Sequence, residues 1–215
     1  ARRYHIATAY DGGCIFLQID GDGVVRAGKI IRYKDGHRVK DGLPVRWMHK
    51  DKRYKDLFTG DTLKQCFFGE HLLPTRPNDP VAIVESEKTA LLMSIAYGNH
   101  PQQVWMACGG KNNINPDKLK PIIDQGRPIR LYPDRDAIGQ WQLAAERLKY
   151  KKVVVDTSLV TRYWKEEDGP KADCGDVIVR ITNESKHLPK PLSRLIMENP
   201  RLRVLIEKLK LQPKQ

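Results

Sequence analysis

The order of apolar and polar residues predicts two kinds of structure along this chain of 215 residues. From residue 81 to residue 156, short apolar runs alternate with longer segments whose apolar residues recur at helical spacing. Runs such as Val81-Ala82-Ile83-Val84 lack polar alternation and indicate strands buried on both faces. This alternation predicts a parallel sheet with right-handed crossovers. Strands are expected at 81–85, 103–107, 129–132 and 152–156, and helices at 87–97 (ending at Gly98), 116–125 and 137–150.

Residues 1–45 follow a different pattern, in which strand-like runs are separated by turns rich in aspartate and glycine. These turns, at 11–13, 20–23 and 34–36, are typical of hairpins. We expect a small antiparallel meander with strands at 6–10, 14–19, 24–33 and 38–44. The predicted fold class is therefore α/β, a parallel sheet flanked by helices and preceded by a small β-rich subdomain.

Two boundaries divide the predicted structure into three parts. Three prolines between residues 74 and 80 indicate a linker. Beyond residue 157 the pattern weakens until a helix expected at 177–183, and from Leu192 to Leu211 it predicts two short basic helices that are interrupted at Pro200. We expect a basic β-rich subdomain at 1–79, an α/β domain at 80–185 and a basic helical tail at 186–215 that packs on the core or binds a partner.

Positive charge is concentrated outside the predicted parallel sheet. Of the formal net charge of +12, residues 1–80 supply +5 and residues 186–215 supply +6. Cations can follow a phosphate backbone while aromatic rings stack on unpaired bases. A stretch that combines both, with Trp47 and Tyr54 among its aromatic residues, is therefore a candidate for nucleic-acid binding; the alternative is a solvated loop whose Trp47 packs into the core. The cations of this basic stretch are Arg46, Lys50, Lys52, Arg53 and Lys55.

Other features narrow the class of protein. Every apolar run is much shorter than the roughly 20 residues that a transmembrane helix needs. The four cysteines form no Cys-x-x-Cys pair, so we expect no zinc site within this chain. The sequence also lacks the motifs of a serine nucleophile elbow and of a phosphate-binding P-loop. A reduced, cytoplasmic protein that does not enter a membrane is the simplest interpretation.

Acidic residues follow two of the buried strands at the point where each strand ends. Glu85 comes directly after the first apolar run, and Asp134 and Asp136 follow the third. Parallel strands place their carboxyl ends at one edge of the sheet, where α/β proteins bind ligands, so we expect these carboxylates to lie together. Such a concentration of negative charge favours Mg²⁺. Taken separately, each cluster is more simply explained as a helix cap or a solvated helix start.

The segments around these carboxylates resemble the toprim domain, which is shared by bacterial primases, type IA topoisomerases and some nucleases. Residues 84–90 (Val-Glu-Ser-Glu-Lys-Thr-Ala) resemble its first motif, and residues 134–139 (Asp-Arg-Asp-Ala-Ile-Gly) resemble its Asp-x-Asp motif. Residues 107–110 (Ala-Cys-Gly-Gly) are similar to its glycine turn, and residues 171–178 (Lys-Ala-Asp-Cys-Gly-Asp-Val-Ile) resemble an element of primase-like members. The resemblance covers roughly residues 80–180.

The resemblance implies the catalytic core of a DNA primase, which joins ribonucleotides on a single-stranded DNA template. It implies that Glu85, Asp134 and Asp136 are catalytic and hold Mg²⁺ or Mn²⁺, together with Asp173 and Asp176. Two roles stay open, because Glu85 can be a ligand or act in proton transfer, and the last two aspartates can simply cap a helix. Lys111, beside the glycine turn, is a further candidate for phosphate binding. The implied partners are nucleotides, the DNA template and a replicative helicase or an upstream zinc-binding module.

Other functions of a toprim fold remain open. A metal-dependent nuclease would use the same carboxylates to hydrolyse a phosphodiester. A non-catalytic module of a mobile element would bind nucleic acid and keep the fold alone. Primases usually carry a zinc module before this core and a helicase-binding domain after it, so the chain resembles an excised core or a primase-like protein of a mobile element. A topoisomerase is disfavoured, because the chain is short for strand passage.

Overall fold

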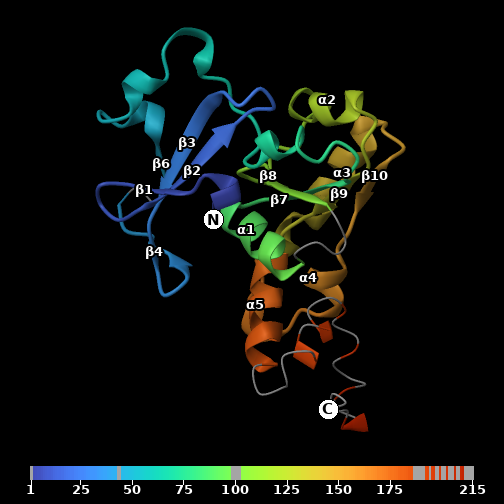
Figure 1. Cartoon of the computed structure of the whole chain (residues 1–215). Coiled ribbons are helices and arrows are strands. Elements are labelled where there is room, and N and C mark those ends of the chain that lie inside the picture. The colour runs from blue at the N-terminus through green and yellow to red at the C-terminus, as the bar shows by residue number, and fades with distance from the viewer. Residues whose placement is uncertain are drawn as a thin grey trace.

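The computed structural model describes residues 2–42, 45–97 and 103–185, together with isolated residues between 192 and 210. This part of the chain contains two four-stranded sheets that share no strand, and a separate two-stranded hairpin (Figure 1). Most of the predicted tail at 186–215 lies outside the described residues, as do the interruption at Pro200 and the expected helix end at Gly98.

The antiparallel sheet has the strand order β1-β2-β3-β6. The chain reverses at the predicted turns between the first three strands, but the strand expected at 38–44 is wrong as a member of this sheet. His37–Arg38 (β5) pairs instead with Tyr33–Lys34 (β4), and the chain turns away at Asp41 and Gly42, whose φ is +59°. The strands of the sheet are β1 (Ala7–Thr8), β2 (Cys14–Ile19), β3 (Val25–Ile31) and β6 (Arg46–Trp47).

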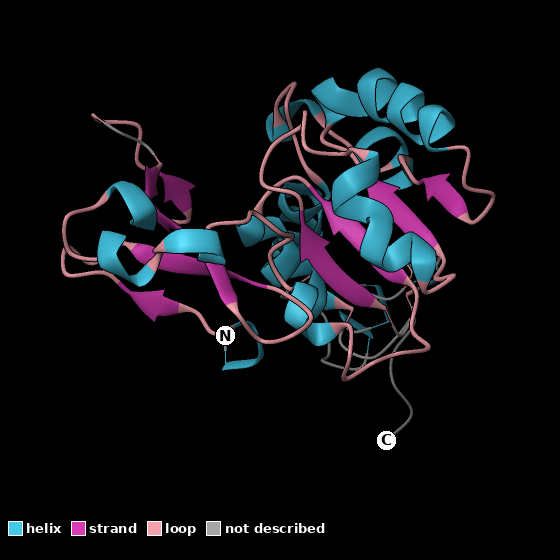
Figure 2. Cartoon of the chain, turned by 90° about the horizontal axis from the view of Figure 1, so that it is seen from above, coloured by secondary structure: helices cyan, strands magenta, loops and turns pink. Residues whose placement is uncertain are grey.

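The second sheet is parallel throughout, with the order β10-β9-β7-β8, as the βαβ alternation predicts. All four residues of the central strand β7 are buried, because helices cover both faces of the sheet (Figure 2). The described fold is therefore α/β, a parallel sheet packed with helices and preceded by an antiparallel β-rich region. The strands are β7 (Val81–Val84), β8 (Val104–Ala107), β9 (Ile129–Tyr132) and β10 (Val153–Val155).

The two helices that follow Ser86 and Asn115 begin at side-chain caps. Ser86 accepts a hydrogen bond from the amide of Thr89 at 3.1 Å, and Asn115 accepts one from Lys118 at 3.0 Å. A short helix after β10 was not expected, because the pattern of apolar residues weakens there. The helices are α1 (Glu87–Ala96), α2 (Pro116–Asp124), α3 (Ile138–Leu148), α4 (Ser158–Arg162) and α5 (Cys174–Glu184). Single 3-10 turns occupy Arg2–Tyr4, Met48–Lys50, Lys55–Leu57, Gly60–Thr62, Glu70–Leu72, Arg135–Ala137 and Glu166–Asp168.

One large hydrophobic cluster connects the two sheets. It contains the parallel strands and their helices, but also Tyr4, Phe16 and Ile31 from the N-terminal region. The hydroxyl of Tyr4 donates a hydrogen bond to the carbonyl of Trp105 in β8 at 2.8 Å. A smaller cluster around Met48 and other buried residues lies within the N-terminal region. The sheets are thus separate while part of the core is shared, and the domain boundary at residue 79 stays a prediction.

Three buried residues of the tail pack against α5. Leu192, Ile196 and Ile206 are buried in a third cluster with Val177 and Ile181. This contact corresponds to one of the two alternatives for the tail, packing on the core, and the tail as a separate part of the chain stays a prediction. Among the described residues, no helix combines the length and the apolar character needed to cross a membrane.

Candidate active site

The ends of three parallel strands meet around Glu85. In the register of β7 and β9, Val84 lies opposite Tyr132, so that Glu85 emerges beside the turn that carries Asp134. On the other side of β7, the amide of Gly109 donates a hydrogen bond to the carbonyl of Glu85 at 2.8 Å. The first acidic cluster, the Asp-x-Asp turn and the glycine turn are thus neighbours at one edge of the sheet.

The carboxylates at this edge perturb one another. Burial raises the pKa of Asp134 to about 9, with the charges of Glu85, Asp173, Asp136 and Asp176 adding to the effect in that order. Burial and the charge of Asp136 also raise the pKa of Glu85, although a hydrogen bond with the side chain of Asp134 partly opposes this. Asp134 and Glu85 together therefore hold a proton to higher pH than separate carboxyl groups would, unless a cation neutralises their charge.

Asp136 is an exposed residue of the group. It lies in the 3-10 turn Arg135–Ala137, and its Oδ2 is 3.7 Å from the ammonium of Lys111 and 4.0 Å from that of Lys171. Lys111 was a candidate for phosphate binding, and here it approaches a carboxylate. Two weak ion pairs of this length are easily exchanged for a ligand, so both lysines remain available to an anion at this site.

Asp173 and Asp176 form a reciprocal cap at the start of α5. Asp173 accepts a hydrogen bond from the amide of Asp176 at 2.9 Å, and Asp176 accepts one from the amide of Asp173 at 3.2 Å. The hydroxyl of Thr89 donates a further hydrogen bond to Asp173, and Lys88 lies 3.5 Å from Asp176. These contacts explain both aspartates as helix caps. Their charges nevertheless reach Asp134, so they belong to the electrostatic surroundings of the site.

The oxygen donors at this edge fit a divalent cation held in part by its substrate. In the described part of the chain, no three acidic, histidine or cysteine side chains converge into a ready-made metal site. Oε2 of Glu85 is, however, buried without a hydrogen-bond partner among the described residues, and Asp134 lies next to it with a strongly raised pKa. Mg²⁺ is often bound through one or two carboxylates, with waters and substrate phosphates completing its coordination.

A buried lysine that the sequence reading missed connects the antiparallel sheet to this site. Lys29 of β3 lies 2.8 Å from Oε1 of Glu87, the first residue of α1, and donates a hydrogen bond to the carbonyl of Gly109 at 2.9 Å. Its ammonium also lies 5.3 Å from the centroid of the Trp47 ring. Both charged residues are buried. The sequence contains one indication that Lys29 is buried, which is that it lies on the same strand face as Ala27 and Ile31. Its ion-pair partner, Glu87, is not indicated by the sequence.

Gly109 is required at the position where this lysine meets the glycine turn. Its φ is +77°, and a Cβ atom there would lie 2.6 Å from Nζ of Lys29 and 3.3 Å from Oε1 of Glu87. The next residues of the turn lead to Lys111, whose carbonyl accepts a hydrogen bond from the indole of Trp141 at 3.1 Å. The ion pair therefore fixes the turn that borders Glu85.

The basic stretch is only partly free for a ligand. Arg46 pairs with Asp11 at 2.5 Å and with Asp51 at 3.5 Å, and the guanidinium of Arg53 stacks 3.6 Å from the ring of Tyr10. Trp47 is half-buried beside Lys29 and His49, and Tyr54 packs against the smaller N-terminal cluster. Three cations of the stretch are exposed and make no ion pair within the described residues: Lys50, Lys52 and Lys55.

Residues 1–135 match the model of a family described as a domain of unknown function, DUF6371. The chain belongs to the DUF6371 family. The matched DUF6371 segment includes the antiparallel sheet, the strands β7 to β9, and both Glu85 and Asp134. No curated protein matches the sequence.

Solved structures similar to this DUF6371 protein include three primase fragments. The primase fragment of the bacteriophage T7 primase-helicase is 18% identical, with a TM-score of 0.49. The match covers 81% of this chain but only 62% of that fragment, so the chain spans less than two thirds of its length. A DNA primase domain from Pseudomonas aeruginosa is 15% identical with a TM-score of 0.43, over 96% of this chain and 68% of that one. The RNA polymerase domain of Mycobacterium tuberculosis primase DnaG is 13% identical with a TM-score of 0.42, over 97% and 74%. Similarities of this size carry no conclusion about activity.

Proposed function

We propose that this protein is a primase-like nucleotidyltransferase that joins ribonucleotides on single-stranded DNA in a reaction dependent on Mg²⁺ or Mn²⁺. The observation that carries the proposal is the meeting of Glu85 and Asp134 at the adjoining ends of β7 and β9, with Asp136 in the following turn. Their order and motifs are those by which the sequence resembles the toprim domain. Clustered carboxylates with raised pKa values are typical of sites that bind a cation or transfer protons.

The residues of the site divide into three roles. Asp134 and Asp136, with Glu85, would hold the cation, whose chemistry is to neutralise phosphate charge that develops during transfer. Oε2 of Glu85, which lacks a hydrogen-bond partner in the described structure, would either bind that cation or accept a proton from the attacking hydroxyl. Lys111 and Lys171 border Asp136 and can turn towards a triphosphate.

The template would bind through cations outside the carboxylate site. Lys50, Lys52 and Lys55 are exposed and unpaired among the described residues, and Arg53 is exposed on the ring of Tyr10. These cations can contact the phosphate backbone of the template. Stacking on bases would contribute less, because the two aromatic side chains of the stretch, Trp47 and Tyr54, are half-buried. A helicase or a zinc-binding module acting with this chain remains part of the proposal.

The test is an assay that scores synthesis and cleavage together. The purified protein is incubated with labelled ribonucleotides and single-stranded DNA of varied sequence, in Mg²⁺, Mn²⁺ or EDTA. Short labelled products that disappear in EDTA and in the Asp134→Asn variant, but persist in the Asp124→Asn control, support the proposal. Asp124 is a suitable control because it is exposed on α2 and paired with Lys120.

Other outcomes of the same assay decide between the alternatives. Metal-dependent shortening of the DNA without any product containing ribonucleotides would identify a nuclease that uses the same carboxylates. DNA binding without synthesis or cleavage, in either metal, would indicate a non-catalytic module. Both results would refute nucleotidyl transfer.

A further inference from the structure

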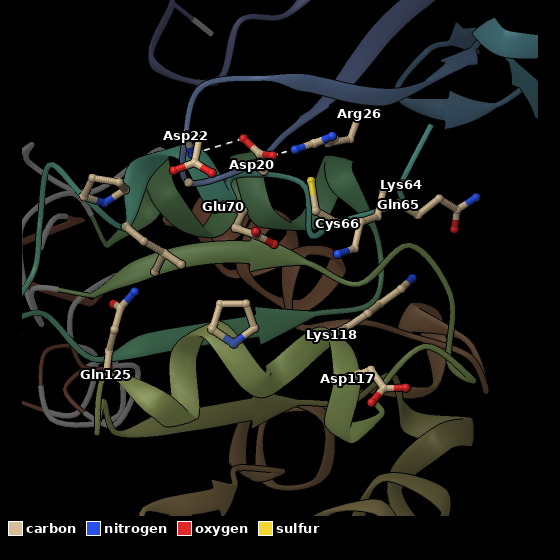
Figure 3. Close-up of a pocket in the computed structure, with 14 residues that line it drawn as sticks. Asp20, Asp22, Arg26, Lys64, Gln65, Cys66, Glu70, Asp117, Lys118 and Gln125 are labelled. Atoms are coloured by element: carbon tan, nitrogen blue, oxygen red, sulfur yellow. Dashed lines mark hydrogen bonds and ion pairs between the residues drawn. The ribbon is translucent and has the colours of Figure 1, made fainter. Parts of the chain in front are cut away.

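A cavity lies between α2 and the turn that joins β2 to β3, and it is separate from the carboxylate site. Its volume is about 570 Å³, which is within the roughly 300–1,000 Å³ of small-molecule sites. The turn between β2 and β3, the segment at 64–74 and one face of α2 form its walls (Figure 3). None of the five candidate metal-binding carboxylates contributes to its lining.

Three cations line the cavity, together with the carboxylates of Asp20, Asp22, Glu70 and Asp117. Lys118 of α2 is half-buried, and neither its ammonium nor that of Lys64 makes an ion pair or a hydrogen bond within the described residues. The third cation, Arg26, is already paired with Asp20 at 2.5 Å. In Figure 3 the labelled side chains of these three cations lie towards the same side of the cavity. Because the ammonium groups of Lys64 and Lys118 make no ion pair within the described residues, they can bind an anionic group of a ligand.

The rest of the lining suits a flat polar ring. Leu73, Pro74 and Pro121 provide an apolar wall, and Gln125 offers an amide at the end of α2. Because Pro121 has no N–H, the carbonyl of Asp117 lacks its usual helical donor, and both residues line the cavity. Glu70 is buried with its Oε2 accepting the amide of Phe67 at 3.0 Å, and burial raises its pKa. These groups can recognise the edge of a nucleobase.

We infer that this cavity binds a nucleoside monophosphate, with the phosphate at Lys64 and Lys118 and the base between Pro121 and the buried Glu70. The cavity also contains Asp22 and Asp117, two carboxylates without an ion-pair partner among the described residues. These carboxylates would repel a polyphosphate or a nucleic-acid strand more strongly than a single phosphoryl group, which carries less charge. The inference is independent of the proposed function, since it uses none of the residues of the carboxylate site.

Equilibrium binding tests the inference without DNA and without metal. AMP, GMP, CMP and UMP are each titrated by calorimetry into the full chain in EDTA, alongside orthophosphate and ribose 5-phosphate. We expect at least one nucleotide to bind, and orthophosphate to bind at least about tenfold more weakly, because it gains nothing from the apolar wall. Lys118→Ala should weaken nucleotide binding by about tenfold, the size expected for a lost hydrogen bond to a charged group.

Two matched variants locate the binding. Lys120→Ala changes a lysine on the same helix that is exposed and paired with Asp124, so it should bind the nucleotide as the unmodified chain does. Asp134→Asn should also bind unchanged, which separates this cavity from the carboxylate site. The inference is overturned if no nucleotide binds at millimolar concentration, or if Lys118→Ala behaves like Lys120→Ala. Binding that is lost in Asp134→Asn, or ribose 5-phosphate binding as tightly as the nucleotides, would also overturn it.

Discussion

Replacing Asp134 by asparagine should stabilise the protein, and the gain should grow with pH. The folded protein raises the pKa of this carboxyl from about 3.8 to about 9, chiefly through burial and the charge of Glu85. A group whose folded pKa is raised contributes most to stability below its unfolded pKa, and this contribution is lost progressively as the pH rises towards the folded pKa. Stability of the unmodified chain should therefore fall between about pH 4 and pH 9, whereas asparagine keeps the neutral form throughout.

The size of the gain follows from the same shift. Each pKa unit corresponds to about 1.36 kcal/mol, so the penalty at pH 7 is at most about 4 kcal/mol for the shift given above. Asp134 is half-buried and its neighbours can relax, so we expect about half of this. The predicted gain in the free energy of unfolding is roughly 1 kcal/mol at pH 5 and roughly 3 kcal/mol at pH 8.

Urea unfolding in EDTA at pH 5, 6, 7 and 8, followed by circular dichroism, measures this gain directly. The control Asp124→Asn removes an exposed helix carboxylate paired with Lys120, and should change stability by less than about 0.5 kcal/mol at every pH. Added Mg²⁺ should stabilise the unmodified chain more than Asp134→Asn, because the variant has lost a ligand. A gain that does not vary with pH, or a loss of stability, would refute the electrostatic reasoning.

Three further predictions concern the surroundings of the site. Lys29→Met and Glu87→Gln should each lower the free energy of unfolding by about 3–5 kcal/mol, because either change leaves one buried charge unpaired, and the double variant should lose less than the sum of the two in urea titrations. Replacing the exposed cations of the basic stretch (all but Arg46) by alanine should reduce the slope of log affinity for single-stranded DNA against log salt concentration by about two to three. An unchanged slope would mean that the DNA binds to another surface. Asp173→Ser keeps a capping oxygen at the start of α5, so its free energy of unfolding should stay within about 1 kcal/mol of that of the unmodified chain. If the folded variant loses activity at low Mg²⁺, Asp173 is a metal ligand. If its activity is unchanged, Asp173 is a helix cap alone.

Much of the fold follows from local patterns in the sequence. The strand at 129–132 has the predicted bounds, and those of β7 and α1 differ from prediction by a single residue at one end. Buried parallel strands and capped helices leave such marks because burial on both faces and the helical repeat act over neighbouring residues. The prediction of a strand at 38–44 was wrong because the strand that completes the sheet, β6, is only two residues long. Its place beside β3 depends on pairing between distant segments, and two residues leave almost no periodic signal in the sequence.

The candidate site divides in the same way. By itself the sequence determined that Glu85, Asp134 and Asp136 follow strand ends, and parallel topology then requires those ends to share an edge. Only the tertiary structure decided that Lys29 pairs with Glu87, that Lys111 and Lys171 approach Asp136, and that α2 faces the turn between β2 and β3 across a cavity. Strand ends are set by neighbours along the chain, whereas an ion pair or a cavity depends on how distant segments pack.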